Sequence, residues 1–313
     1  RALVVDSIEQ SKTLLGQLER GASANGLFVG AARSDPKVAW QFTGQGSQYI
    51  GMAQQLYRSQ SVFRDALDRC DHSLRQWREG SLLNVMFHDE ALLNDTTWTQ
   101  PALFAVEVGL AELLSGWGLR PDVVLGHSVG QFAAACVAGI IGWEDGLRLI
   151  SERSRLVGAL PSGGAMAAVF APVADVQEAI DAHTSLSIAA VNGSHTVISG
   201  PEQSIVAAMA LFSENNVRNK RLTTSHAFHS TLMEPAMDEW QSIAESIEFR
   251  RAEIPLVCNV SGKLMDADQV LDGAYWGRHL RQAVQFADSV ATLAEFGCDV
   301  VVELGPQPTL TGM

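Results

Sequence analysis

Short apolar runs alternate with longer helical segments along most of this chain. Four runs of branched and aromatic residues have the length of buried strands, and the segments between them show the apolar spacing of helices. Strands are expected at residues 38–42, 123–125, 254–260 and 299–304, and helices at 6–19, 47–95, 101–117, 131–140, 144–160, 231–248 and 285–297. Pro101 suits the first turn of its helix. This alternation predicts an α/β fold with a mainly parallel sheet.

One segment in the middle of the chain follows a different order. Strands are expected at 164–170, 186–192, 195–200 and 217–225, and helices at 172–183 and 201–216. The order β-α-β-β-α-β within about 60 residues is that of a ferredoxin-like unit. Because the α/β pattern returns afterwards, residues 162–225 are predicted to be a small subdomain inserted into a large one, residues 38–161 and 226–313. Residues 1–37 are expected to be a linker remnant docked on this core.

The composition excludes several classes of function. The 313 residues are 47% hydrophobic and 18% charged, which suffices for a large core and argues against disorder. The charge balance of 22 basic against 35 acidic residues, net −13, does not fit a nucleic-acid binder or a protein of acidic membrane surfaces. The longest uncharged apolar stretch, residues 132–143, has about half the length of a membrane span.

The cysteines indicate neither a metal site nor a disulfide framework. The four cysteines, at 70, 136, 258 and 298, lie far apart, and no His/Cys cluster has the spacing of zinc ligands. Reduced thiols in a cytoplasmic protein are expected. The chain begins at Arg1, and residues 2–5 have the character of a strand rather than a signal sequence. We therefore expect a piece of a longer protein.

Residues 126–130, GHSVG, fit the G-x-S-x-G pattern of a nucleophile elbow. A buried strand precedes the motif and a helix rich in small residues follows it, which is the context that an elbow requires. Ser128 would occupy a strained turn, and Gly126 and Gly130 would let strand and helix approach closely. The helix N-terminus would direct N–H groups toward an oxyanion. The alternative is an ordinary glycine-rich turn between strand and helix.

A serine nucleophile needs a base. Of the eight histidines, His226 and His229 stand apart because they lie in residues 225–230, SHAFHS, where the chain re-enters the large subdomain. A structural role for either histidine is the alternative. A hydrolase of the esterase or lipase type would share the elbow, but it predicts an HGGG loop that does not occur in this chain.

Four separated motifs together resemble one family. They are FTGQGSQ (42–48), GHSVG (126–130), an arginine in the helix after the elbow, and HAFHS (226–230). In this order they resemble the acyltransferase domain of a type I polyketide synthase, and they are similar to the malonyl-CoA:acyl carrier protein transacylases. The resemblance runs from the linker at 1–37 to the LGPQPTLTG ending. It implies an α/β-hydrolase-like large subdomain with the ferredoxin-like insertion.

The resemblance implies a role for each matching residue. Ser128 would become an acyl ester and His229 would be its base, with His226 the competing choice. The backbone N–H groups of Gln45 and Val129 would form the oxyanion hole. The family orients its histidine with a backbone carbonyl, which by position would belong to His279.

The resemblance also implies a substrate. Arg153 lies 25 residues after the serine, the spacing of the family's carboxylate-binding arginine, and a guanidinium can bind the free carboxylate of malonyl-CoA with two hydrogen bonds. Phe228 would fill the space that an α-methyl group needs. Val129 and the segment 95–100, DTTWTQ, which ends at Gln100, also match malonyl-type relatives. Gln131 departs from the family, which usually has an acidic residue there.

The implied reaction takes malonyl-CoA as substrate and the phosphopantetheine thiol of an acyl carrier protein as acceptor. No tightly bound cofactor, metal, nucleic acid or membrane is implied. A neighbouring ketosynthase domain is the expected partner of the N-terminal linker. A decayed docking domain without activity is the non-enzymatic alternative, and the presence of Ser128, His229 and Arg153 argues against it.

Overall fold

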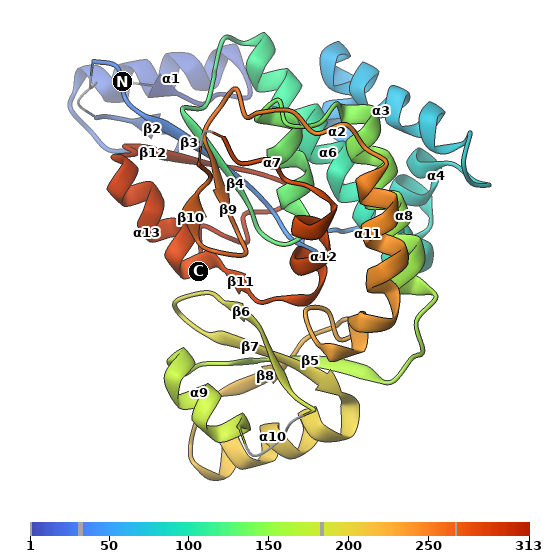
Figure 1. Cartoon of the computed structure of the whole chain (residues 1–313). Helices are drawn as coiled ribbons and strands as arrows, with labels where there is room; N and C mark the ends of the chain where they lie inside the picture. The colour runs from blue at the N-terminus through green and yellow to red at the C-terminus, as the bar shows by residue number, and fades with distance from the viewer. Residues whose placement is uncertain (1, 31–33, 182–184, 267) are drawn as a thin grey trace. The chain divides into compact units, whose positions relative to one another are not determined.

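A computed structural model describes residues 2–30, 34–181, 185–266 and 268–313 (Figure 1). The chain divides into two compact units, Arg1–Pro36 and Lys37–Met313. In the first unit, β1 (Ala2–Leu3) pairs antiparallel with β2 (Leu27–Phe28), and α1 (Ile8–Glu19) connects them. Ser7 caps this helix by accepting a hydrogen bond from the N–H of Gln10.

The large subdomain is built on a five-stranded sheet. Its order is β10 (Lys263–Leu264), β9 (Leu256–Cys258), β4 (Val123–Gly126), β3 (Val38–Phe42) and β12 (Val300–Leu304). The last four are parallel, and β10 is antiparallel to β9. These four correspond to the apolar runs expected as strands, and the central strand β4 is completely buried, as its sequence requires.

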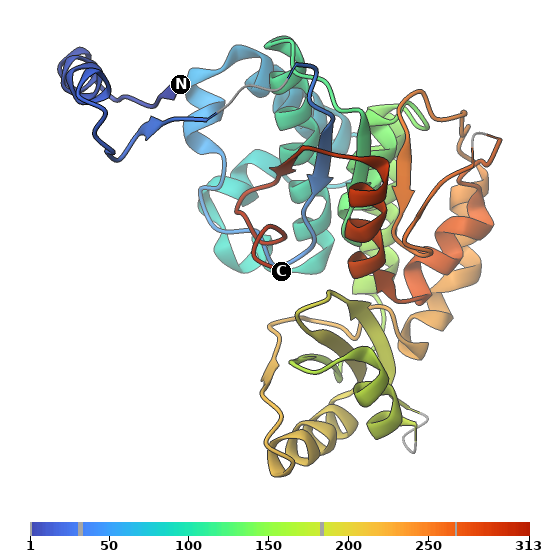
Figure 2. The same ribbon diagram turned by 90° about the vertical axis from the view of Figure 1, so that its left-hand side faces the viewer.

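Helices surround this sheet and connect its strands (Figures 1 and 2). They are α2 (Gln54–Ser59), α3 (Ser61–Leu74), α4 (Leu82–His88), α5 (Glu90–Leu93), α6 (Thr96–Gly116), α7 (Gly130–Val137), α8 (Trp143–Gly158), the 3₁₀ helix η1 (Thr231–Ala236), α11 (Met237–Glu245), α12 (Gly273–Arg281) and α13 (Phe286–Phe296). Helix α7 packs on β4 and β3, and α6 packs between α3 and α8. No helix in the described part of the chain combines the length and apolar character needed to cross a membrane.

Helix α6 begins earlier than its sequence suggested. It starts at Thr96 with Asp95 as its cap, so Pro101 lies inside the helix rather than in its first turn. Because proline has no N–H, the carbonyl of Thr97 is not used within the helix. Arg78 Nη1 and Ser154 Oγ donate to this oxygen over 2.6 Å and 3.1 Å. The proline thus leaves an acceptor that ties α8 to α6.

The small subdomain has its own sheet and core. The sheet order is β11 (Val284–Gln285), β6 (Ser187–Val191), β7 (Thr196–Pro201), β5 (Gly164–Val169) and β8 (Asn219–Arg221). With α9 (Val173–Ile180) and α10 (Glu202–Glu214), strands β5 to β8 have the ferredoxin-like order. Strand β11, from the C-terminal part of the chain, adds to β6 in parallel, so one strand of this sheet comes from outside 162–225. The last residues of the helix expected at 172–183 lie outside the described residues.

Candidate active site

A cavity of about 260 Å³ is lined by residues of both subdomains. Its wall includes six residues singled out from the sequence: Gln45, Ser128, Val129, Arg153, Phe228 and His229. The large sheet supplies the loops after β3 and β4, and the small sheet supplies apolar side chains opposite them. Segments from Gly44 to Met313, about 270 residues apart in the sequence, therefore meet in one space.

The elbow around Ser128 has the strained geometry that its motif predicts. Ser128 has φ = +51°, in the left-handed region that residues with a side chain rarely adopt. A Cβ on Gly126 would clash with the backbone of Gly130 and Gln131, and one on Gly130 would clash with the carbonyl of Phe42. The two glycines are thus required by close packing, and the turn places the Ser128 hydroxyl in the cavity.

Ser128 and His229 form a hydrogen-bonded pair. Ser128 Oγ lies 2.8 Å from His229 Nε2, and His229 Nδ1 lies 2.8 Å from the carbonyl oxygen of Gln282. A carbonyl only accepts, so Nδ1 carries the proton and Nε2 accepts the serine proton. His229 also has a positive φ, +55°. The pair therefore has the tautomer that general-base catalysis needs.

The carbonyl that orients His229 belongs to Gln282, not to His279 as the sequence suggested. Helix α12 ends at Arg281 and Gln282 is extended, with ψ = 159°, so its carbonyl leaves the helix and meets His229 Nδ1. The His279 carbonyl makes only a weaker contribution that raises the pKa of His229. The His279 ring instead lies beneath the elbow, with Nε2 3.1 Å from the carbonyl oxygen of Ser128.

The pKa of His229 is lowered to about 3, mainly by burial and next by the positive charge of Arg153. The Gln282 carbonyl opposes both effects by raising the pKa. The imidazole is consequently neutral at neutral pH and able to accept a proton.

His226, the competing base, does not contact the serine. Its Nδ1 lies 2.9 Å from Ser225 Oγ, and its Nε2 lies 3.4 Å from the carbonyl oxygen of Leu160. Both ring nitrogens thus contact neighbouring residues, which indicates a structural role for His226.

Arg153 is a buried cation, and two of its nitrogens have no hydrogen-bond partner among the described residues. Its side chain is 1% exposed, and Nη1 donates to Gln100 Oε1 over 2.6 Å. Nε and Nη2, the two nitrogens on one edge of the guanidinium, have no hydrogen-bond partner among the described residues. Burial lowers the pKa of Arg153 to about 10, so it remains charged at neutral pH. A buried cation with a free two-donor edge is suited to binding a carboxylate.

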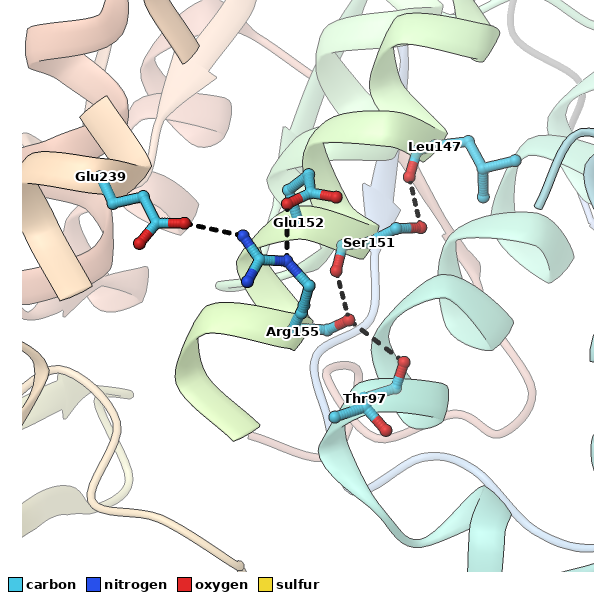
Figure 3. A network of polar contacts seen from close by, with 7 residues as sticks. Thr97, Leu147, Ser151, Glu152, Arg155 and Glu239 are labelled. Atoms are coloured by element: carbon cyan, nitrogen blue, oxygen red, sulfur yellow. Dashed lines mark hydrogen bonds and ion pairs between the residues drawn. The ribbon is translucent and has the colours of Figure 1, made fainter. Parts of the chain in front are cut away.

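The other arginines of helix α8 have different surroundings. Arg148 is exposed, and Arg155 forms ion pairs at 2.8 Å with Glu152 and with Glu239 of α11. Figure 3 shows this pairing. It also shows, on the side of α8 away from Glu239, the hydrogen bond from α8 to the carbonyl oxygen of Thr97. Because the helix is tied on both sides, Arg153 is held in a fixed position.

Gln45 and Val129 line the same cavity as Ser128. Val129 is the N-cap of α7, and Gln45 belongs to the loop after β3. Neither backbone N–H donates a hydrogen bond to another described residue. Gly46, with φ = +112°, and Gly44, which contacts His127, allow the loop to approach the elbow.

The buried side chain of Glu107 is hydrogen-bonded to the start of the loop after β3. Thr43 Oγ1 donates to Glu107 Oε1 over 2.8 Å, and Ser47 Oγ donates to Thr43 Oγ1 over 3.1 Å. Glu107 is fully buried in α6, and burial raises its pKa well above the usual range. The carboxyl group therefore keeps its proton to a higher pH in the folded protein than in the unfolded chain.

Replacing Glu107 with glutamine is expected to remove the part of the free energy of unfolding that the wild type loses as pH rises. A raised folded-state pKa contributes stability below the ordinary pKa of glutamate, and this stability is lost as pH rises. The free energy of unfolding of the wild type should thus fall relative to that of Glu107→Gln by about 1.4 kcal/mol per pH unit until the folded-state pKa is reached. Urea unfolding of both proteins between about pH 5 and pH 8 measures this. If the free energies of unfolding of the two proteins changed in parallel with pH, Glu107 would be ionised in the folded protein and the prediction would be wrong.

Two further residues at the site were missed from the sequence. Gln282 acts through its main chain, which leaves no signal in the residue type. Asn192 of the small subdomain lies 3.0 Å, through Oδ1, from His127 Nε2 and 2.9 Å, through Nδ2, from His195 Nε2. Gln131, the departure from the family pattern, is buried and donates to the Val257 carbonyl over 3.4 Å, outside the cavity wall.

Comparison with known proteins assigns the family. A family model described as an acyl transferase domain matches residues 39–313. The chain is a member of this family. It is 45% identical over its whole length to the phenolphthiocerol synthesis polyketide synthase type I Pks15/1 of Mycobacterium marinum, of which it spans 15%.

Solved structures agree with this acyl transferase assignment. The acyltransferase domain from the second module of the salinomycin polyketide synthase is 38% identical, with a TM-score of 0.93 over 99% of this chain and 73% of that one. The malonyl CoA-acyl carrier protein transacylase of Clostridium perfringens is 27% identical, with a TM-score of 0.82 over 88% of each chain. The two-sheet fold of the domain is therefore that of polyketide synthase acyltransferases.

Proposed function

We propose that this acyltransferase domain transfers malonyl from malonyl-CoA to the phosphopantetheine thiol of an acyl carrier protein. The observation that carries the proposal is that Arg153, whose Nε and Nη2 have no hydrogen-bond partner among the described residues, lines the same cavity as the Ser128–His229 pair. The terminal carboxylate of a malonyl group would pair with this cation, whereas a plain acyl group would leave it without a counter-charge.

In the first step Ser128 Oγ attacks the thioester carbonyl of malonyl-CoA as its proton passes to His229 Nε2. The N–H groups of Gln45 and Val129 stabilise the oxyanion, a contribution of about 3 kcal/mol for each such donor. When the tetrahedral intermediate collapses, the C–S bond breaks. The departing sulfur takes the proton from His229, and malonyl remains as an ester on Ser128.

In the second step the phosphopantetheine thiol gives its proton to His229 and its sulfur attacks the ester. Collapse of this intermediate breaks the bond to Ser128 Oγ, which recovers the proton from His229. The sequence is symmetrical, so one histidine serves as base and then as acid in each half.

The substrate carboxylate also affects the base. The charge of Arg153 is one of the causes that lower the pKa of His229. A malonyl carboxylate on Nε and Nη2 would offset that charge and raise the pKa of the imidazole toward its ordinary range. Binding of a diacid is therefore expected to favour proton transfer as well as affinity.

Phe228 supports a preference for malonyl over methylmalonyl. Its ring lines the cavity, is 7% exposed and has its centroid 5.9 Å from the Arg153 guanidinium carbon. Phe228→Ser should raise kcat/KM for methylmalonyl-CoA relative to malonyl-CoA by about tenfold or more, since a single methyl group is worth about 1–3 kcal/mol in a tight pocket. Phe228→Leu, which keeps bulk, is the control and should change the ratio by less than about threefold. An unchanged ratio for the serine variant would place specificity elsewhere.

The proposal is tested by intact mass measurement after mixing with acetyl-, malonyl- and methylmalonyl-CoA, followed by addition of a phosphopantetheinylated carrier protein. We expect stable malonyl on the wild type, none on Ser128→Ala, and transfer to the carrier. Preferential loading of acetyl, or release of malonyl to water with no transfer, would contradict the proposal.

The partners and location of the parent protein remain predictions. The curated relatives are much longer chains, and this chain spans only 15% of the Mycobacterium marinum synthase. We propose that the Arg1–Pro36 unit connects to a neighbouring ketosynthase domain within such a synthase. A cytoplasmic location is predicted from the sequence alone.

A further inference from the structure

A chain of hydrogen bonds connects the carboxylate-binding arginine to the oxyanion loop. Arg153 Nη1 donates to Gln100 Oε1 over 2.6 Å, Gln100 Nε2 to Thr96 Oγ1 over 2.8 Å, and Thr96 Oγ1 to Gln45 Oε1 over 3.2 Å. Arg153, Gln100 and Thr96 are each at most 2% exposed. The chain therefore runs through the interior, where water does not compete for its bonds.

The arginine fixes the direction of the first two bonds in this chain. A guanidinium has no acceptor, so it must face the oxygen of Gln100, and the NH₂ of that amide must then face Thr96. The third bond runs from the Thr96 hydroxyl to Gln45 Oε1, because an amide oxygen only accepts and the hydroxyl supplies the proton. Thr96 is the residue that joins the Gln100 amide to the side chain of Gln45.

We propose that Thr96 is a positioning residue that couples recognition of the acyl carboxylate at Arg153 to the placement of the Gln45 loop. The inference rests on the proposed roles of Arg153 and Gln45. One side of the Thr96 hydroxyl orients Gln100, which orients the guanidinium. The other side anchors the side chain of the residue whose backbone N–H faces the oxyanion. A displacement at either end would be transmitted to the other.

The test compares Thr96→Val with Thr96→Ser, using malonyl-CoA and acetyl-CoA. Valine keeps the shape of threonine but removes the hydroxyl, which leaves the Gln100 NH₂ buried without an acceptor. We expect Thr96→Val to lower kcat for acetyl loading about tenfold and kcat/KM for malonyl loading about a hundredfold. Thr96→Ser should stay within about twofold of the wild type for both substrates. An effect on one substrate alone, or equal losses for both, would overturn the coupling.

A variant at the far end tests the same coupling without altering helix α6. Gln45→Leu removes the side-chain acceptor and keeps the backbone N–H. The malonyl-to-acetyl ratio of kcat/KM should fall about tenfold, although Gln45 does not contact Arg153. Adding Thr96→Val to Gln45→Leu should lower that ratio by less than the product of the two single effects. An unchanged ratio in Gln45→Leu, or full additivity, would overturn the inference.

Failure of the proposed function would be seen separately. If the wild type does not prefer malonyl to acetyl, the role of Arg153 fails and the coupling inference fails with it. If the wild type prefers malonyl and both Thr96 variants match it, only the coupling fails. Thermal unfolding of each variant shows whether a loss of activity reflects loss of the fold.

Discussion

Replacing His229 with alanine is expected to lower the rate of Ser128 acylation by about 10³- to 10⁴-fold. The serine would lose the acceptor that now lies 2.8 Å from its hydroxyl, and the leaving sulfur would lose its proton donor. Because the close packing at Gly126 and Gly130, and not the His229 ring, shapes the turn at Ser128, the elbow should persist. Stopped-flow measurement of CoA release in a single turnover reports this step directly.

His226→Ala is the matched control, since the same residue type lies three positions earlier in the same segment. Both nitrogens of His226 face Ser225 and Leu160 rather than the nucleophile. The rate of Ser128 acylation in His226→Ala should remain within about fivefold of that in the wild type. A large loss in this variant with little loss in His229→Ala would reverse the assignment of the base.

Replacing Arg153 with alanine is expected to lower kcat/KM for malonyl-CoA by about 10²- to 10³-fold, because a buried charge pair of this kind is worth about 3–4 kcal/mol. Acetyl-CoA has no carboxylate for the arginine to bind, so its loading should fall by no more than about tenfold, through the hydrogen bonds that connect Arg153 to the Gln45 loop. Removal of a buried positive charge near His229 should favour protonation of the base. Steady-state kinetics with both substrates measure the change in preference.

Two further variants sharpen this prediction. Arg153→Lys keeps the charge but cannot offer two parallel donors, so it should recover only part of the malonyl activity. Arg148→Ala, on the exposed side of the same helix, should have no effect on either substrate. Equal losses of malonyl and acetyl loading in Arg153→Ala would contradict the carboxylate role.

The elements with the strongest sequence signals were predicted most reliably. The core strand β4 is a short apolar run followed by a small-residue helix, and burial on both faces leaves that sequence few other structures. Helix α12 and strand β11 were missed. Helix α12 carries polar residues and two arginines in its last turn, and β11 has only two residues, which are ordered by pairing with β6. Long-range pairing of this kind is not visible in a local pattern.

Within the site, residues with reactive side chains were predicted more reliably than a residue that contributes only its main chain. Ser128, His229 and Arg153 were found because their side chains carry chemistry at the positions of recognisable motifs, and the structure places all three in one cavity. The partner of His229 was assigned to His279 instead of Gln282, because any residue can supply a carbonyl and the choice depends on where α12 ends. The contact of Asn192 with the elbow depends on how the small sheet packs against the large subdomain, which a single sequence does not reveal.

The most direct test is a crystal structure of the domain after soaking with malonyl-CoA. We predict a malonyl ester on Ser128 Oγ, its carbonyl oxygen at the N–H groups of Gln45 and Val129, and its carboxylate on Nε and Nη2 of Arg153. An ester whose carboxylate points away from Arg153, or an acyl group on a different residue, would contradict the account.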